Sequence, residues 1–443
     1  MKIKIPSLKK GLLLLLSILF STISCSDVLE EDVVVDMEQL RADRKDKDKD
    51  DEGDEEESDE EDQDDDDDDD EFEKHPSLFF VQLPQGIDED EVEDLLEDLN
   101  SEEVWFREEI NLRLWNTSVF PYTSAQGEQV TNIDGQIARA RTRTRVSGAT
   151  FNVGGIVDSP LASQNLFCFE QSVNLQAPAD NELMISIFDT GIDTSMFPEF
   201  SGYDYIDDDE NPEDTHGHGT QVTGLIHKLI TQNGSAENIE IDIRKTHDNQ
   251  GLGFASTLIP AILDAVNEGT DFLNFSFSYQ DVNEDTANRP MRLAIDYAEQ
   301  NGVLILAAAG NTNKDNDKDA IISFPASYPN ANIISNAALS CENKLSGFSS
   351  YGKNSVDLAF LGENIPVEGL NGSAFDQSGT SFSTACLTAM AAIMASNQEN
   401  MDAAAIKCAL INTSDYSDNL KDVVASKGVV NFEAALANMN NCN

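Results

Sequence analysis

Three polar groups in this sequence stand where an acyl-transfer reaction would need them. Asp189 follows an apolar segment, 183–188, that has the composition of a buried strand. His218 lies between two glycines, and Ser381 directly precedes an alanine-rich stretch with helical character. A serine nucleophile needs a base to take its proton, and the base needs a carboxylate that fixes its tautomer. The positive end of a helix dipole at Ser381 would also favour developing negative charge.

Taken singly, each group has a common structural role. An aspartate before a glycine at a strand end usually makes a turn, and a serine before a helix is usually an N-cap. A histidine among glycines is more often a loop residue than a base. The occurrence of all three in one chain, in the order Asp, His, Ser, is what indicates a triad.

Four motifs in register resemble those of the subtilase family. They are Ile187-Phe188-Asp189-Thr190-Gly191-Ile192-Asp193, His218-Gly219-Thr220-Gln221-Val222-Thr223-Gly224, Ala307-Ala308-Ala309-Gly310-Asn311 and Ser378-Gly379-Thr380-Ser381. The resemblance covers about Cys168 to Leu436. It implies a serine endopeptidase with Asp189, His218 and Ser381 as its triad and an acyl-enzyme intermediate at Ser381. It also implies that the side chain of Asn311 donates to the oxyanion, and that no cofactor is required.

The resemblance further implies how substrate binds. Subtilases take up a protein or peptide substrate as an added strand between two backbone segments. The matching residues here are Gly251, Leu252 and Gly253 on one side, Ser276, Phe277 and Ser278 on the other, with Ala308 and Gly310 beside them. Tyr279 stands where the family usually has glycine, so we expect its side chain to crowd the pocket for the residue before the scissile bond.

Strand-like and helix-like segments alternate from residue 183 onwards, which predicts a parallel sheet with helices on both faces. The expected strands are 183–188, 239–243, 272–277, 303–308, 333–338 and 356–360, and the expected helices are 220–230, 256–267, 291–300 and 383–396. The predicted fold class is therefore α/β, a subtilisin-like three-layer fold with a mostly parallel central sheet, preceded by a small α+β segment. Polar groups at strand ends should meet at one edge of such a sheet.

Four domains follow from composition: 1–24 a signal peptide of lipoprotein type, 25–74 an acidic disordered linker, 75–150 a small α+β segment, and 151–443 the catalytic domain. The signal has basic residues before an apolar stretch and ends at Cys25. Cys25 is the predicted lipidation site, although Thr22 departs from the usual leucine, and simple cleavage is the alternative. We expect export and a lipid anchor in the outer membrane or at the cell surface, otherwise secretion.

The role of the small segment stays open between two interpretations. It stands where subtilases carry an inhibitory propeptide, and the arginines between Arg139 and Arg145 would suit a processing stretch. Alternatively it is a permanent accessory domain, in which the alternation of arginine with small residues forms one solvated strand face. The chain's own N-terminal segment is thus a candidate inhibitor.

Charge and cysteine usage exclude several function classes. The 28 basic and 83 acidic residues give a net charge of −55, which argues against nucleic acid as a partner. The 19 acidic residues between Asp51 and Glu73 offer only weak, solvated ligands to calcium, so calcium is not indicated as a cofactor. No zinc-type spacing occurs, and no metal site is predicted. Cys408 and Cys442 are candidates for a disulfide, with buried unpaired cysteines as the alternative.

Two other functions on the same fold are alternatives to the endopeptidase. A catalytically idle, peptide-binding surface protein would be expected to lack a triad member, and none is missing. A peptide ligase or cyclase, in which an amine replaces water, usually adds a domain that caps the site, and the sequence shows no such insertion.

Overall fold

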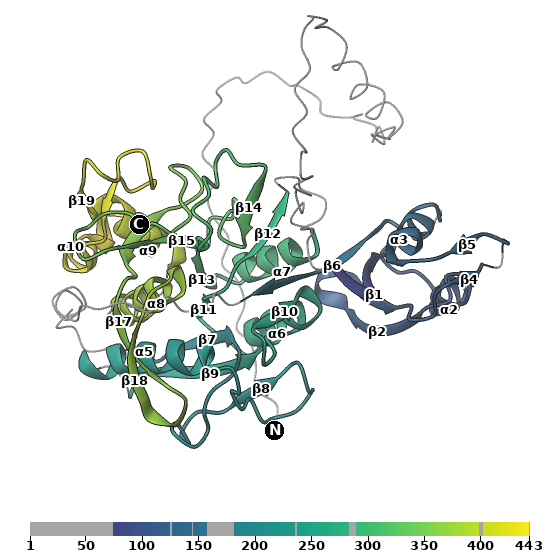
Figure 1. Cartoon of the computed structure of the whole chain (residues 1–443), viewed down its shortest axis with the longest axis horizontal. Helices are drawn as coiled ribbons and strands as arrows, with labels where there is room; N and C mark the ends of the chain where they lie inside the picture. Colours follow the sequence, from purple (N-terminus) through teal and green to yellow (C-terminus); the bar gives the residue numbers. More distant parts are fainter. Residues whose placement is uncertain are drawn as a thin grey trace, which may run out of the picture. The chain divides into compact units, whose positions relative to one another are not determined.

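The computed structural model describes residues 74–124, 126–143, 145–156, 181–234, 237–282, 289–397 and 402–442. The predicted signal peptide, Cys25 and the acidic linker lie outside the described residues, so their predictions stay predictions. Figure 1 shows the described elements in order, from β1 in purple to α10 in yellow.

The small N-terminal domain is an antiparallel sheet with two helices. Its elements are β1 (Lys74–Gln82), α2 (Glu89–Asp98), β2 (Glu102–Arg107), β3 (Leu112–Asn116), α3 (Ile133–Arg141) and β6 (Gly148–Ile156). Within this domain the strand order is β6-β1-β3-β2. The helices and the sheet share one buried apolar cluster, which includes Val92 and Leu95 of α2, Ile137 of α3 and Trp115 of β3. This agrees with the expected small α+β segment.

The first half of the arginine-rich stretch is helical and Arg143 and Arg145 follow the helix, so the prediction of one solvated strand face is wrong. Arg139 and Arg141 lie in the last turn of α3, whose first turn is capped by Asn132. The side chain of Arg139 is 3% exposed and pairs with Asp98. Arginine and alanine are both good helix formers, so alternation in the sequence did not specify a strand.

The central sheet of the second domain has seven parallel strands in the order β16-β15-β13-β11-β7-β9-β8. The strands are β7 (Leu183–Asp189), β8 (Gly202–Asp204), β9 (Ile239–Lys245), β11 (Phe272–Phe275), β13 (Leu304–Ala308), β15 (Ile333–Leu339) and β16 (Leu358–Leu361). Each of the six expected strands is present. β8 is additional, and three residues are too few to give a sequence pattern.

Helices cover the two faces of this sheet because successive strand residues point to opposite sides. Leu304 and Leu306 of β13 pack in one apolar cluster with α5 (His218–Gln232) and α8 (Thr380–Ser396). Ile305 and Ala307 pack in the other cluster with α6 (Ala255–Asn267) and α7 (Arg289–Gln300). Both faces of the strands are therefore apolar, as parallel sheets require. Figure 1 shows these helices around the sheet.

The two domains form a continuous structure. β10 (Leu252–Phe254) pairs antiparallel with β6 of the small domain, with Leu252 opposite Ile156 and Gly253 opposite Gly155. Phe80, Leu112 and Leu114 of the small domain belong to the same apolar cluster as α6. The predicted boundary at 150/151 therefore cuts through β6, which belongs to the sheet of the small domain.

The cysteines near the C-terminus are joined. A disulfide links Cys408, on α9 (Ala403–Thr413), to Cys442. Cys386 is a free thiol buried in α8. Cys341 is disulfide-bonded as well. Of Cys341, Cys386, Cys408 and Cys442, Cys386 alone is therefore a buried, unpaired cysteine. Within the described ranges, no helix has both the length and the apolar character needed to cross a membrane.

Candidate active site

The carboxylate of Asp189 faces the imidazole of His218. Nδ1 of His218 lies 2.8 Å from Oδ1 and 2.9 Å from Oδ2 of Asp189, and both side chains are 1% exposed. Burial alone would raise the pKa of the Asp189 carboxyl, but the charge and hydrogen bond of His218 hold this pKa below its usual range. An ionised carboxylate on Nδ1 fixes the tautomer that leaves Nε2 as the proton acceptor.

Local hydrogen bonds explain why the two residues meet. Asp189 is the last residue of β7, and His218 is the first residue of α5. The hydroxyl of Thr190 donates to Asp214 and accepts from the backbone N–H of Gly219. A Cβ atom at Gly219 would overlap the carbonyl oxygen of Gly191, so only glycine lets the helix start so close to the strand end.

Asp214 organises the loop before α5. Its carboxylate, 3% exposed, accepts from the backbone N–H groups of His216, Gly217 and Thr220 and from the Thr220 hydroxyl. A carboxylate at a helix N-terminus satisfies backbone donors that the helix leaves unpaired. Sequence reasoning missed this residue. The signal was an acidic residue a few positions before the histidine motif, where it could serve as a cap.

Ser381 lies in the first turn of α8, which begins at Thr380. The neighbouring residue, Phe382, packs its ring 5.7 Å from the imidazole of His218, between ring centroids. The hydroxyl of Ser381 donates a 2.7 Å hydrogen bond to the carbonyl of Ser276. The serine and the histidine thus stand at the N-termini of two helices that pack on the same face of the sheet.

Asn311 lies beside the nucleophile with a fixed orientation. Its Oδ1 accepts from the backbone N–H and the hydroxyl of Thr380, both at 2.9 Å. Because these donors engage Oδ1, Nδ2 is the atom that can donate to an oxyanion. Thr380 is therefore a positioning residue that motif matching did not single out.

The predicted substrate-binding residues come from three separate segments. Gly251 lies in the turn before β10, and Leu252 and Gly253 lie in β10, which pairs with β6. Ser276, Phe277 and Ser278 follow β11. Ala308 ends β13, and a Cβ at Gly310 would lie 3.4 Å from Oγ of Ser278.

Tyr279 does not crowd the pocket as expected. It opens β12 (Tyr279–Val282), is 4% exposed, and packs in the apolar cluster of α6 and α7. Its hydroxyl pairs with that of Tyr328 at 2.8 Å. The prediction failed because side-chain direction along an extended segment alternates, and the sequence did not give the phase.

Among the described residues, the side chains of the other three histidines of the catalytic domain make no hydrogen bond to the carboxylate of Asp189. His216 accepts from the backbone N–H of His218, and His227 packs against Phe197 and Phe200. His247 is wholly buried behind Asp189, and burial lowers the pKa of its imidazole to about 4. It is therefore uncharged at neutral pH.

Comparison with known proteins agrees with this geometry. The family model described as "Subtilase family" matches residues 180–432 of this chain. The thermophilic serine proteinase of Bacillus sp. strain AK1 is 31% identical over 227 residues, which cover 49% of this chain and 53% of that protein. Thermitase of Thermoactinomyces vulgaris is 30% identical over 241 residues, which cover 52% of this chain and 80% of thermitase. The chain thus spans about half the length of the first relative.

A solved structure shares the fold over a longer stretch. The epidermin leader peptide processing serine protease EpiP of Staphylococcus aureus superposes with a TM-score of 0.63 at 17% identity, covering 83% of this chain and 99% of EpiP. That share exceeds what the second domain alone can supply, so the likeness in fold includes residues of the small domain. With a family match over more than half of its residues, a subtilisin-like α/β fold and an Asp–His pair at the expected strand end and helix start, the chain belongs to the subtilase family of serine peptidases.

Proposed function

We propose that this protein is a serine endopeptidase that hydrolyses peptide bonds through Asp189, His218 and Ser381. The observation that carries the proposal is the buried Asp189–His218 pair beside a serine at a helix N-terminus. Each member of the triad is present, and each comes from the element that the family resemblance requires.

The reaction follows from these positions. The Ser381 hydroxyl leaves the Ser276 carbonyl, gives its proton to Nε2 of His218 and attacks the substrate carbonyl carbon. Nδ2 of Asn311 and the backbone at the start of α8 stabilise the resulting oxyanion. His218 then protonates the leaving amine, the C–N bond breaks, and an ester at Ser381 remains. Water, deprotonated by His218, attacks the ester and releases the acid and Ser381.

Peptide binding by strand addition is supported by β6. This strand lies against β10 in antiparallel register, as an added peptide strand would. The segment that follows β6 is outside the described residues, so no cleavage point is assigned to it.

We also propose that the small domain is an inhibitor of the enzyme. It contacts α6 along its length: Asn152 exchanges hydrogen bonds with Ser256 at 2.8 and 3.0 Å, and Arg107 makes a bidentate pair with Asp264 at 2.8 and 3.1 Å. Together with β6 on β10, these contacts support inhibition, because β6 would then lie along the edge that we propose for the substrate. The permanent accessory domain is the alternative. Isolation of a fully active enzyme that still carries the residues before 156 would contradict inhibition.

The N-terminal predictions remain part of the proposal. Export, a lipid anchor at Cys25 and a spacer function for the acidic linker would place the enzyme at a membrane surface, with protein or peptide substrates outside. Mass spectrometry of the mature N-terminus tests this: a diacylglyceryl group on Cys25 supports the anchor, and an unmodified start beyond Cys25 contradicts it.

The central experiment is turnover of fluorescent casein by the purified chain, compared with the Ser381→Ala variant and followed by labelling with a fluorophosphonate. Cleavage that is lost in the variant, with label only on Ser381, supports the endopeptidase. A folded sample from which the residues before 157 have been removed, yet which neither cleaves nor takes up the label, would contradict it and favour the peptide-binding protein. Transfer of the acyl group to an added amine in preference to water would favour the ligase.

A further inference from the structure

His247 lies directly behind the edge strand that the peptide would join. Its backbone forms a bridge with Gly253 of β10, on the side away from β6, and its N–H donates to the carbonyl of Asp189 at 3.2 Å. The side chain is wholly buried. The imidazole therefore sits between the triad carboxylate's strand and the peptide-binding edge, although the mechanism does not use it.

Three residues form one row across this small sheet. Gly155 of β6 is opposite Gly253 of β10, and Gly253 is opposite His247. Directly opposed residues in antiparallel strands have their side chains on the same face of the sheet, about 4.5–5.5 Å apart at Cβ. A side chain at position 155 would therefore emerge on the face that carries the imidazole.

The imidazole fills the space above Gly253. A Cβ at Gly253 would lie 2.5 Å from Cδ2 and 2.8 Å from Nε2 of His247, so the ring extends across the row toward β6. The ring of Phe277 packs against it, with 4.8 Å between centroids. Phe277 is itself wholly buried, so the ring of His247 has a rigid support on the side of the second substrate-binding segment.

The orientation of the ring does not depend on a strong internal hydrogen bond at Nε2. Nδ1 lies 3.1 Å from the hydroxyl of Thr246, and Nε2 makes no hydrogen bond to any described residue. Packing against Gly253 and Phe277 therefore holds the ring in place. Shape is accordingly the property through which it acts on a neighbouring peptide.

We infer that His247 is a specificity-determining residue that restricts the peptide position opposite Gly253 to glycine or another small residue. The inference rests on the proposed peptidase function and on β6 as a stand-in for a bound peptide. Gly155 fits the restriction, since the strand that occupies the edge has glycine at this point. A branched or aromatic side chain at this peptide position would clash with the imidazole. The close-packed surroundings of the ring leave little room for it to move aside.

The test is a positional peptide library with every position before the scissile bond varied in turn, hydrolysed by the active form of the wild-type chain. One position should prefer glycine or alanine over leucine by about 10-fold or more in kcat/KM, the discrimination that a pocket wall typically provides. In His247→Ala this ratio should fall to near one, while His247→Phe, which keeps a ring, should retain it. His227→Ala, a histidine far from β10, is the matched control and should leave the profile unchanged.

The outcomes separate the two proposals. A wild-type enzyme that accepts leucine equally at every position, or a ratio unchanged in His247→Ala, overturns the inference while the peptidase stands. Absence of both hydrolysis and fluorophosphonate labelling in the wild type contradicts the peptidase itself.

A second measurement covers the case that His247→Ala does not fold. Gly155→Leu in the full chain should weaken the contact of β6 with β10 and speed fluorophosphonate labelling of Ser381 about 10-fold or more. Gly155→Leu combined with His247→Gly should return labelling toward the wild-type rate. If removal of the residues before 157 speeds labelling and Gly155→Leu leaves the rate unchanged, the inference is overturned.

Discussion

The candidate active site and the small N-terminal domain each contain a cluster of hydrogen-bonded polar side chains, and the two clusters differ in how their members are bonded. In the candidate active site, Asp189 occupies Nδ1 of His218, and Thr380 occupies Oδ1 of Asn311. The Ser381 hydroxyl donates to the main-chain carbonyl of Ser276. Neighbouring residues thus hold one end of the His218 side chain and one end of the Asn311 side chain in place.

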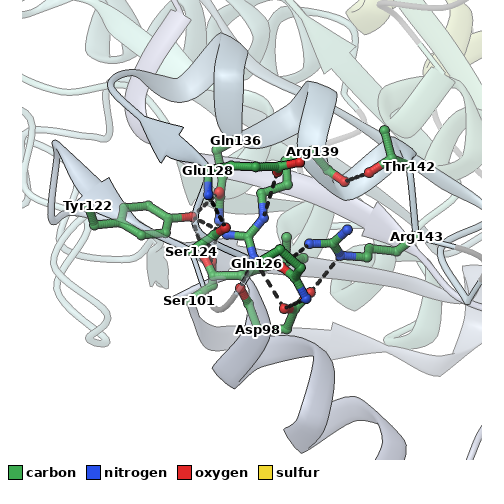
Figure 2. A network of polar contacts seen from close by, with 11 residues as sticks. Asp98, Ser101, Tyr122, Ser124, Gln126, Glu128, Gln136, Arg139, Thr142 and Arg143 are labelled. Carbon is green, nitrogen blue, oxygen red and sulfur yellow. Dashed lines mark hydrogen bonds and ion pairs between the residues drawn. The ribbon is translucent and has the colours of Figure 1, made fainter.

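The cluster of the small domain closes on itself. Asp98 accepts from Gln126, Arg139 and Arg143, and Arg139 also donates to Tyr122 and to the backbone carbonyl of Asp98. Figure 2 shows Arg139 and Arg143 converging on Asp98, with Tyr122 on the other side of Arg139. These bonds tie the C-terminus of α2 to α3. These groups find their partners inside the small domain, so they stabilise its structure, whereas we propose a catalytic role for the cluster around His218.

The largest effect should come from Asn311→Ala. Loss of an oxyanion donor lowers turnover by about 100- to 1000-fold in enzymes that use one, a subtilisin being the known example. The free energy of unfolding should fall by about 1–2 kcal/mol, because the substitution removes the acceptor of two hydrogen bonds from the buried Thr380. Peptide kinetics and thermal unfolding of the same sample measure both. If the two losses are equal in kcal/mol, Asn311 acts on the structure as much as on turnover, and the two clusters do not differ in role.

Removal of the disulfide should destabilise the catalytic domain alone. Cys408 and Cys442 are 34 residues apart, and a cross-link over such a loop stabilises by about 3–4 kcal/mol through the unfolded chain. The variant Cys408→Ser with Cys442→Ser should therefore unfold at lower denaturant concentration. Hydrogen exchange, followed domain by domain, should show no change in α2 and α3. Cys386→Ser, which alters a free thiol in α8, is the comparison that tests for a general effect of losing a cysteine.

Arg139→Ala should destabilise the small domain by about 3 kcal/mol, because it leaves Asp98 with one fewer cationic partner in a site where the arginine is 3% exposed. If this domain inhibits, fluorophosphonate labelling of Ser381 should become faster. Arg145→Ala is the matched control: Arg145 is 44% exposed, its contacts are 3.9 Å long, and the change should cost less than about 0.5 kcal/mol. Equal destabilisation by the two variants would mean that the network has no special role.

The smallest effect should be a dependence on acid. Burial alone would raise the pKa of Asp98, but hydrogen bonds from Gln126 and Arg143 and the charges of Arg143 and Arg139 hold this pKa below its usual range. The folded domain therefore binds fewer protons than the unfolded chain at this group. Its contribution is fully present above the unfolded pKa, near 4, and is lost as the pH falls through the lower, folded pKa.

Unfolding of the small domain monitored between pH 6 and pH 2 tests this. Asp98→Asn should be less stable at neutral pH and should flatten the acid limb. An acid limb identical to that of the wild type would show that another carboxyl controls it.

The sequence by itself determined the α/β fold of the catalytic domain and the elements on which its polar motifs stand. The Asp189 strand end, the glycines around His218 and the helix after Ser381 are local patterns, and local patterns specify strands, turns and helix starts directly. Because parallel strands bring their ends to one edge, the order of the motifs was enough to predict that Asp189 and His218 meet, and the role of Ser381 stays a prediction.

The tertiary structure decided what depends on partners distant in the chain. Arg139 became a buried helical residue because Asp98 lies 41 positions earlier, and the sequence pattern around it fits a strand equally well. Tyr279 turned inward because Tyr328 and the core of α6 receive it. The row formed by Gly155, Gly253 and His247 joins three separate segments, and register between separate segments is set by packing rather than by composition.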